Sequence, residues 1–399
     1  MKINTFQLSL ICLILFCSGL ATAQTPRGPG PYDWWYTLEQ GKQMFKQGDY
    51  GTALLTFEDA RRQRQTMFTR MERDLIDLLS IYEVRRLGDS LDWIERYIDE
   101  RHYDSAAAAL QELYFRIPKE TFNNSVTAAL DALGTLKDYP EAEQWIGETY
   151  LVEGELTLAL NQFQKTLVMR DLFENPDYAT EMLYKIAGIR RLRQEYTEME
   201  RILLSILAND RLWSSEESSR PADNTNGQPD SGTIPAEAST SFARQAMTRT
   251  LENNGIDRYI TLYRYSNNES AHAHRLLGFY YYISGRHARA QEHLMFAFLI
   301  QNTVIIDEIV RRRFDYSFTS LNALASEINR NPILLDYTEK NEYYKTAYYL
   351  GTSLYGNGKT IAAVSIWNFL AAQNNAGEWQ QRARSQLQSP HVERGLEMP

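Results

Sequence analysis

Apolar positions recur along the chain with helical spacing, in short blocks that indicate paired helices. Within residues 41–60, Ala53, Phe57 and Ala60 lie four and then three residues apart, so they share one face of a helix. Gly48 precedes this helix at a position where glycine ends the previous helix in a left-handed conformation. The block therefore predicts a helical hairpin.

Gly41 lies inside the first predicted helix of this hairpin. A glycine in a helix interior costs about 1 kcal/mol relative to alanine, so it needs a compensating role. Close approach of the second helix supplies one, and we expect Gly41 to lie at a helix contact.

The hairpin pattern recurs along the chain. Three further copies carry both glycines, and their first glycines are Gly147, Gly278 and Gly351. Two weaker copies lack the glycines and are marked by Ile94 and Ala187. Successive copies are 53, 53, 40, 91 and 73 residues apart, so we expect extra helices between them. Three segments have the apolar spacing of such helices: 67–86, 121–136 and 316–330.

The second clear copy shows the pattern in full, with Gly147, Tyr150, Gly154, Ala159 and Phe163 in order. This glycine–aromatic–alanine pattern resembles the tetratricopeptide repeat (TPR), although none of the gaps has that family's 34-residue period. The resemblance implies an all-α fold, a right-handed superhelical array of antiparallel helix hairpins (a TPR-like α-solenoid) with extra helices. An ordinary helical bundle is the alternative, but four copies of two spaced glycines disfavour it.

Composition divides the chain into segments. Residues 214–240 are rich in Ser, Pro, Asn, Asp and Gly and have no helical period, which predicts a disordered linker or loop. We therefore expect an N-terminal array at 33–213 and a C-terminal array at 241–387, followed by a disordered tail at 388–399. Two separate domains and one solenoid with a long insertion both fit this division.

Residues 1–23 have the features of a secretory signal peptide: Lys2, an apolar run of 13 residues, and a small-residue cleavage site that ends at Ala23. The run is too short for a bilayer, which needs about 20 residues. Lipid attachment at Cys17 is the rival interpretation, and the bulky Phe16 before the cysteine disfavours it. The leader predicts a protein of the bacterial periplasm or outer surface.

Cleavage removes Cys12 and Cys17, the only two cysteines, so the mature chain has no disulfide, no thiolate catalyst and no Cys-bound zinc. Loss of Lys2 leaves 41 basic and 51 acidic residues, a net charge of −10. An acidic chain is unsuited to non-specific nucleic-acid binding. It also lacks a basic patch for a membrane surface, and we expect no stable membrane insertion after cleavage.

We find no constellation of catalytic or metal-binding residues in the sequence. Histidines at 272 and 274 point in different directions on one helix, and His287 occupies a packing position of the hairpin pattern. The Gly358-Lys359-Thr360 triplet lacks the earlier glycine and the strand of a phosphate-binding loop. The basic run 311–313 lies beside acidic residues that suit exposed ion pairs. The sequence therefore predicts no enzyme, no cofactor and no metal site.

The chain has 25 tyrosines and an aromatic content of 12%. In TPR folds the first helix of each hairpin lines a groove, and the resemblance implies that aromatic and basic residues of these helices bind a protein there. The alternative is that the tyrosines of 279–282 fill an irregular core. The implied groove residues are Trp35, Lys42, Phe45, His272, Arg275, Phe279, Tyr282, Lys345, Tyr348 and Tyr355.

These observations predict an extracytoplasmic scaffold or adaptor that binds a protein or peptide partner, in the assembly of a cell-envelope complex. The alternative is a carrier of a small apolar ligand or lipid in a helical pore lined by the tyrosine-rich stretches 279–282 and 343–349.

Overall fold

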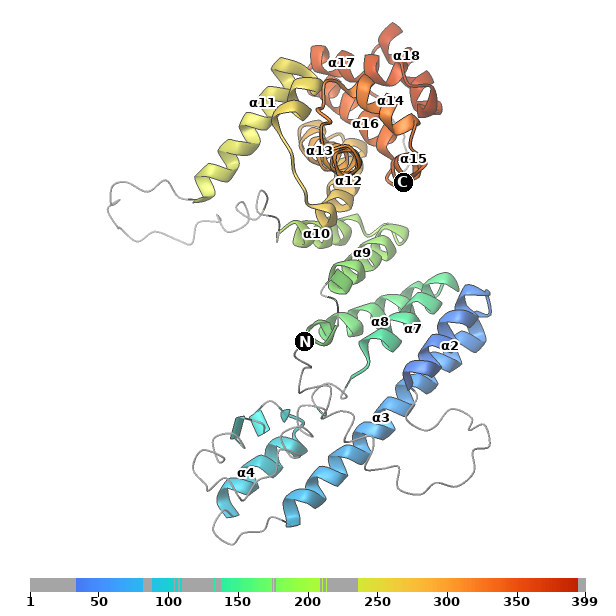
Figure 1. The fold of residues 1–399 in the computed structure, drawn as a ribbon, viewed down its shortest axis with the longest axis vertical. Coiled ribbons are helices and arrows are strands. Elements are labelled where there is room, and N and C mark those ends of the chain that lie inside the picture. Colours follow the sequence, from blue (N-terminus) through green and yellow to red (C-terminus); the bar gives the residue numbers. More distant parts are fainter. Residues whose placement is uncertain are drawn as a thin grey trace, which may run out of the picture. The chain divides into compact units, whose positions relative to one another are not determined.

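The computed structural model describes residues 34–81, 88–103, 105–106, 108–109, 133, 138–173, 175, 177–208, 210, 213 and 236–393. Regular structure in these residues is entirely helical, and they contain no strand (Figure 1). This confirms the all-α prediction and the pairing of helices that are adjacent in sequence. The predicted leader, residues 1–23, and nearly all of the predicted helix 121–136 lie outside the described residues.

The chain forms two compact units, residues 1–174 and 175–399. The predicted boundary at 214–240 is therefore not where the chain divides. Helix α10, which precedes that segment, packs against α12, which follows it, so both belong to the second unit. Helix α11 already begins at Ala236, inside the predicted linker, and residues 214–235 lie outside the described part.

Among its described residues, unit 1 contains two hairpins with both helices in view, and the second helix of the first packs on the first helix of the second. They are α2 (Trp34–Lys46) with α3 (Tyr50–Ile81), and α7 (Pro140–Val152) with α8 (Leu156–Val168); α4 (Gly88–Asp99) contacts α3. The prediction of a separate helix at 67–86 was wrong. Those residues continue α3 as far as Ile81, because no glycine or proline interrupts the chain after Gly51.

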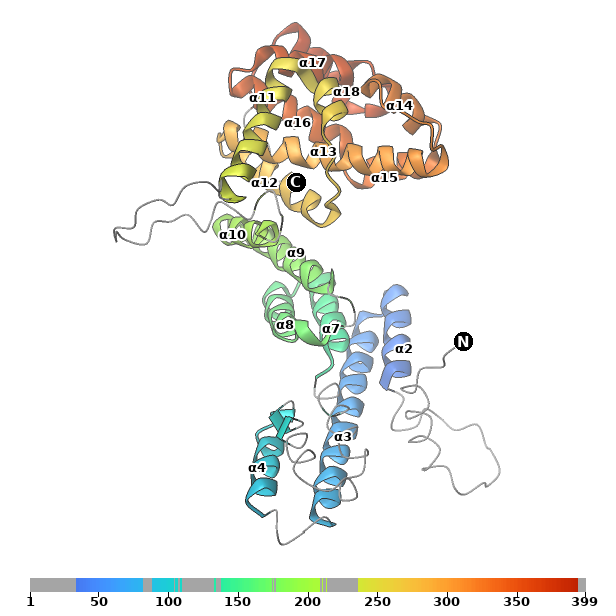
Figure 2. The ribbon, with the colours of Figure 1, turned by 60° about the vertical axis from the view of Figure 1, so that its left-hand side comes forward.

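In the described part of unit 2 there are three hairpins and several further helices (Figures 1 and 2). The hairpins are α9 (Asp177–Leu192) with α10 (Tyr196–Leu207), α12 (Asn268–Ile283) with α13 (His287–Arg312), and α16 (Tyr343–Gly356) with α17 (Thr360–Ala371). The further helices are α11 (Ala236–Leu262), α14 (Leu321–Asn329), α15 (Pro332–Lys340) and α18 (Glu378–Gln388). The expected extra helix at 316–330 is present as α14, which starts later because Ser320 caps it.

Helix α10 contacts α12, and α13 contacts α16, so each hairpin of unit 2 packs on the next. Figures 1 and 2 place α11 and the α14–α15 pair on opposite sides of the α12–α13 hairpin. Helix α18 packs against α16 and α17, and α11 packs against α17 and α13. Helix α11 is broken at Gly255, whose φ of 80° and ψ of 174° are not helical.

The first glycine of each clear hairpin lies directly under a large side chain of the second helix. A Cβ built on Gly41 would be 2.5 Å from the Phe57 ring, and one on Gly278 would be 2.5 Å from Leu294 Cγ. Real Cβ atoms do not approach other atoms this closely, so only glycine fits. The same contact joins Gly147 to Phe163 at 2.6 Å and Gly351 to Trp367 at 2.8 Å. The expected close approach at Gly41 is confirmed, and in all four copies the partner lies 16 residues later.

The second glycine of each copy makes the turn between the helices. Gly48, Gly154, Gly285 and Gly358 all have a positive φ, between 73° and 84°, and a Cβ there would meet nothing within 4 Å. The two weaker copies place Arg101 and Gln194 at this turn, with φ of 60° and 59°. The turn conformation is therefore kept where the glycine is absent, at the steric cost that L-residues have in the left-handed region.

Helix α13 is the core of unit 2. Its side chains from Leu294 to Ile300 are all fully buried beneath the helices that pack on it. Among the described residues it is the one helix long and apolar enough to cross a bilayer, and most of that apolar stretch is buried inside the structure.

Candidate functional site

The first helices of the three hairpins in unit 2 are joined by side-chain contacts. The Tyr184 hydroxyl of α9 accepts a hydrogen bond from the Ala273 N–H of α12 at 3.1 Å, and its ring packs on His272 with centroids 4.9 Å apart. Arg275 Nε lies 3.5 Å from the Glu342 carboxylate, which also pairs with Lys345 Nζ at 2.7 Å. We call this connected surface of α9, α12 and α16 the first-helix face.

Burial sets the charge state along this face. Desolvation lowers the pKa of His272 to about 4, and the neighbouring Arg275 lowers it further, although part of the ring is open to solvent. His272 is therefore neutral near pH 7, and its Nδ1 lies 2.7 Å from an Arg275 nitrogen. Burial also lowers the pKa of Arg275, while the Glu342 carboxylate raises it. The Arg275–Glu342 pair is thus a partly buried ion pair between two hairpins.

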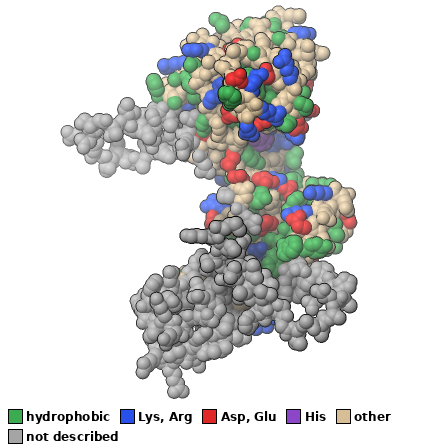
Figure 3. All heavy atoms as spheres, in the orientation of Figure 1, with side chains coloured by type: hydrophobic (Ala, Val, Ile, Leu, Met, Phe, Trp, Pro, Cys, Tyr) green, Lys and Arg blue, Asp and Glu red, His purple; other side chains and the backbone are tan. Residues whose placement is uncertain are grey.

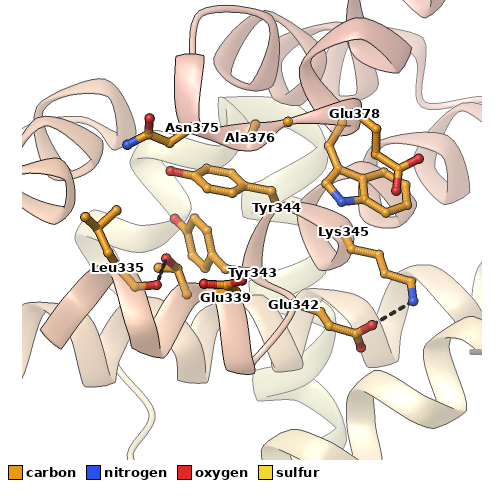
Figure 4. A pocket seen from close by; sticks show the side chains of 12 residues that line it. Leu335, Glu339, Glu342, Tyr343, Tyr344, Lys345, Asn375, Ala376 and Glu378 are labelled. Atoms are coloured by element: carbon orange, nitrogen blue, oxygen red, sulfur yellow. Dashed lines mark hydrogen bonds and ion pairs between the residues drawn. The ribbon is translucent and has the colours of Figure 1, made fainter. Parts of the chain in front are cut away.

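A cleft of about 750 Å³ opens at the α16 end of this face, between α15, the start of α16 and the start of α18. Figure 4 shows Glu339 and Glu342 on one side, the rings of Tyr343 and Tyr344 in the middle, and Asn375 and Glu378 on the other side. The Tyr344 hydroxyl is buried and makes no hydrogen bond. Three carboxylates against one lysine give the lining an acidic excess.

Backbone geometry orients the acidic side of the cleft. Glu342 has a left-handed conformation, with φ of 49°, between the end of α15 and the start of α16. This places its carboxylate between Lys345 and Arg275, whereas Glu339 is exposed and forms no ion pair with the described residues. A residue other than glycine or asparagine in this conformation carries strain, which is frequent at binding sites.

The residues after α18 return to the first-helix face. The Tyr355 hydroxyl donates to the Pro390 carbonyl at 3.2 Å, the His391 N–H donates to Gln386 Oε1 at 2.9 Å, and the Tyr348 hydroxyl donates to the Glu393 carboxylate. The prediction of a disordered tail at 388–399 is therefore wrong for Gln388, which ends α18, and for residues 389–393, which tyrosine and glutamine side chains of α16 and α18 hold. Residues 394–399 lie outside the described part.

The ten implied groove residues fall into two groups. Trp35 and His272 are exposed, and Phe45, Lys42, Lys345 and Tyr355 are half-buried. The other four are buried, which corrects the expectation that they lie on an open surface: Arg275, Phe279, Tyr282 and Tyr348. They are covered because α12 and α16 pack against each other, α18 packs on α16, and residue 393 contacts Tyr282 and Tyr348.

The implied residues of unit 1 lie mostly at helix contacts. Phe45 packs edge-on against Tyr50 and Trp145, with ring centroids 5.1 and 5.3 Å away. Lys42 pairs with Glu39 at 2.5 Å and lies 5.8 Å from the centre of the Trp145 ring. Of these three residues, only Trp35 exposes a large apolar side chain to solvent.

Two buried histidines form a contact that spacing along one helix did not reveal. His274 of α12 and His293 of α13 place their Nδ1 atoms 3.0 Å apart, so one ring donates and the other accepts. Trp213 covers both rings, with centroids 4.9 and 4.5 Å away, and the Arg244 guanidinium lies 4.7 Å above Trp213.

Burial lowers the pKa of His274 to about 3, with Arg244 lowering it further and Asp210 opposing. Burial also holds the pKa of His293 well below its usual value, and His274 and Arg289 add to this. The pair is therefore neutral at pH 7.

Other polar groups singled out in the sequence have structural partners. His287 packs on Gly356 and Tyr282, Gly358 makes the α16–α17 turn, and the arginines of 311–313 pair with Glu308 and Glu327. Across the described part of the chain, no group of three or more His, Cys, Asp or Glu side chains is placed to hold a metal ion.

No family model matches the chain. It is similar to a protein of Treponema pallidum (strain Nichols) that is named only as uncharacterized, with 23% identity over 362 residues that cover 90% of each chain. The matched length exceeds either unit, so the similarity extends through both.

Proposed function

We propose that this protein is an extracytoplasmic scaffold or adaptor, a TPR-like α-solenoid whose first-helix face in unit 2 binds a protein partner, in the assembly of a cell-envelope complex. The observation that carries the proposal is the cleft of about 750 Å³ at the end of that face, with its acidic and aromatic lining and the buried, unbonded Tyr344 hydroxyl. The hairpins that share one glycine contact and one turn geometry support the solenoid.

The chemistry of the cleft favours a basic side chain of the partner. Glu339 supplies a carboxylate without an ion pair among the described residues, and Tyr344 and Trp379 supply rings that attract a cation. Over the rest of unit 2, Figure 3 shows basic and acidic side chains interspersed on the visible face.

The packing of its expected lining disfavours the pore of the carrier alternative. The tyrosine-rich stretches that were to line a pore pack against each other: Phe279 on Tyr349 at 4.9 Å between ring centroids, and Tyr282 on the same ring at 5.1 Å. These rings form core contacts, so we retain the protein-binding function alone.

Charge reversal in the cleft tests the proposal. We expect Glu339→Lys to weaken partner capture from the native envelope at least tenfold, because it places a cation where the partner's basic group binds. Asp336→Lys is the matched control: it lies one turn earlier on α15, outside the cleft lining, and should leave capture unchanged. Equal capture by both variants, measured by quantitative mass spectrometry, contradicts the proposal.

A further inference from the structure

The half of the first-helix face beyond the cleft already contains an extended segment. Residues 389–393 lie along α16 and α18 without helical structure. The side chains that hold them define what we call the tail groove: Tyr282, Tyr348, Tyr355, Arg382 and Gln386.

Most contacts in the tail groove are made to the main chain. Tyr355 donates to the Pro390 carbonyl at 3.2 Å, Tyr282 donates to the Glu393 carbonyl at 3.4 Å, and Gln386 accepts from the His391 N–H at 2.9 Å. These bonds recognise an extended backbone, and they do not depend on the side chains that it carries.

One side chain of the segment is recognised. The Glu393 carboxylate accepts a hydrogen bond from the Tyr348 hydroxyl and lies 3.5 Å from an Arg382 guanidinium nitrogen. Burial of Tyr348 raises its pKa, and the bond to Glu393 raises it further, so the phenol remains a donor. The tail groove therefore favours a segment with a carboxylate side chain three residues after the residue whose carbonyl accepts from Tyr355.

The groups that face the segment are built into the core. Tyr348 and Gln386 are fully buried, and they are hydrogen-bonded to each other at 3.2 Å as well as to the segment. Removing the segment breaks these hydrogen bonds and opens the two side chains to water, and the net worth of each lost bond is about 1 kcal/mol. An occupant with an extended backbone and a carboxylate side chain would restore the same hydrogen bonds when the tail leaves.

We propose that the tail groove is a binding site for an extended acidic segment of the partner, and that the chain's own residues 389–393 occupy it until that segment displaces them. This inference rests on the proposed function, because it extends the partner's contact from the cleft along the same face. The tail follows α18 directly, so its effective concentration is at least about millimolar and only a partner anchored elsewhere competes well.

A peptide tests the groove directly. A fluorescent peptide with the sequence of residues 388–399 is titrated by anisotropy into the full chain and into its Glu393→Gln variant, whose tail is bound less firmly. We expect the variant to bind the peptide at least tenfold more tightly than the unaltered chain. A peptide with glutamine in place of its Glu393 should bind at least tenfold more weakly to the same variant.

Adding Tyr348→Phe to the Glu393→Gln variant should weaken peptide binding again, with circular dichroism and thermal melting showing that the chain stays folded. Equal affinity of both chains for the peptide, or no binding to a folded Glu393→Gln chain up to millimolar peptide, overturns the inference. Either failure together with Glu339-dependent capture leaves the proposed function intact. Peptide binding without Glu339-dependent capture contradicts the proposed function but supports the inference about the tail groove.

Discussion

Lowering the pH from 7 to 5 is expected to reduce the free energy of unfolding of unit 2 by about 4 kcal/mol. The cause is the buried pair His274–His293, which the folded protein holds neutral because burial lowers both pKa values. In the unfolded chain each histidine takes up a proton below pH about 6.5. The unfolded state then binds more protons, so stability falls as the pH drops from 6.5 toward the lowered pKa values, by about 2 kcal/mol for each ring at pH 5.

Urea unfolding at pH 7, 6 and 5, followed by circular dichroism, measures this loss. His293→Gln removes one of the two rings, so its loss between pH 7 and 5 should be about 2 kcal/mol smaller than that of the unaltered protein, whatever its stability at pH 7. His391→Gln changes an exposed histidine and should leave the loss unchanged. If His293→Gln loses as much stability between pH 7 and 5 as the unaltered protein, other groups cause the acid sensitivity.

Gly278→Val is expected to destabilise unit 2 by about 3 kcal/mol, because its Cβ would lie 2.5 Å from Leu294 Cγ and 3.3 Å from the Leu294 backbone nitrogen. A flexible side-chain end would move aside, but these atoms are at the base of Leu294 and in the backbone of α13. The hairpin has to open for valine to fit.

Gly188→Val is the matched control, since Gly188 lies inside α9 with nothing within 4 Å of a built Cβ. There the change should alter stability by less than about 0.5 kcal/mol, because valine has a slightly better helix propensity than glycine. Urea denaturation of both variants gives the comparison. Similar changes in stability at the two positions would show that Gly278 has no packing role.

The hairpins were predictable from the sequence because glycine marks both of their special positions. Gly278 lies at a close contact and Gly285 at a left-handed turn, and each leaves a local signal that survives in a single sequence. Helix lengths were less predictable. Nothing in the residues after Gly51 stops α3, so a continuous helix and two shorter ones shared the same apolar pattern.

The exposed side of the first helices was not predictable from their spacing. Phe279 and Tyr282 lie on α12, and Tyr348 lies on α16, and most side chains of both helices are buried. The exposed stripe of α12 includes His272 but not these two rings, so the open groove of a regular repeat does not describe its buried sides. The tail groove depends on contacts between residues more than 30 positions apart, such as Tyr348 with Glu393, which leave no local signal.

The binding function of the first-helix face is tested most directly by photo-cross-linking in the native envelope. A photo-reactive residue at position 339 or 375, both in the cleft lining, should cross-link one reproducible partner protein. The same residue at position 361, which is exposed on the second helix α17, should not. Cross-linking to that partner from 361 with none from 339 and 375 would contradict the account.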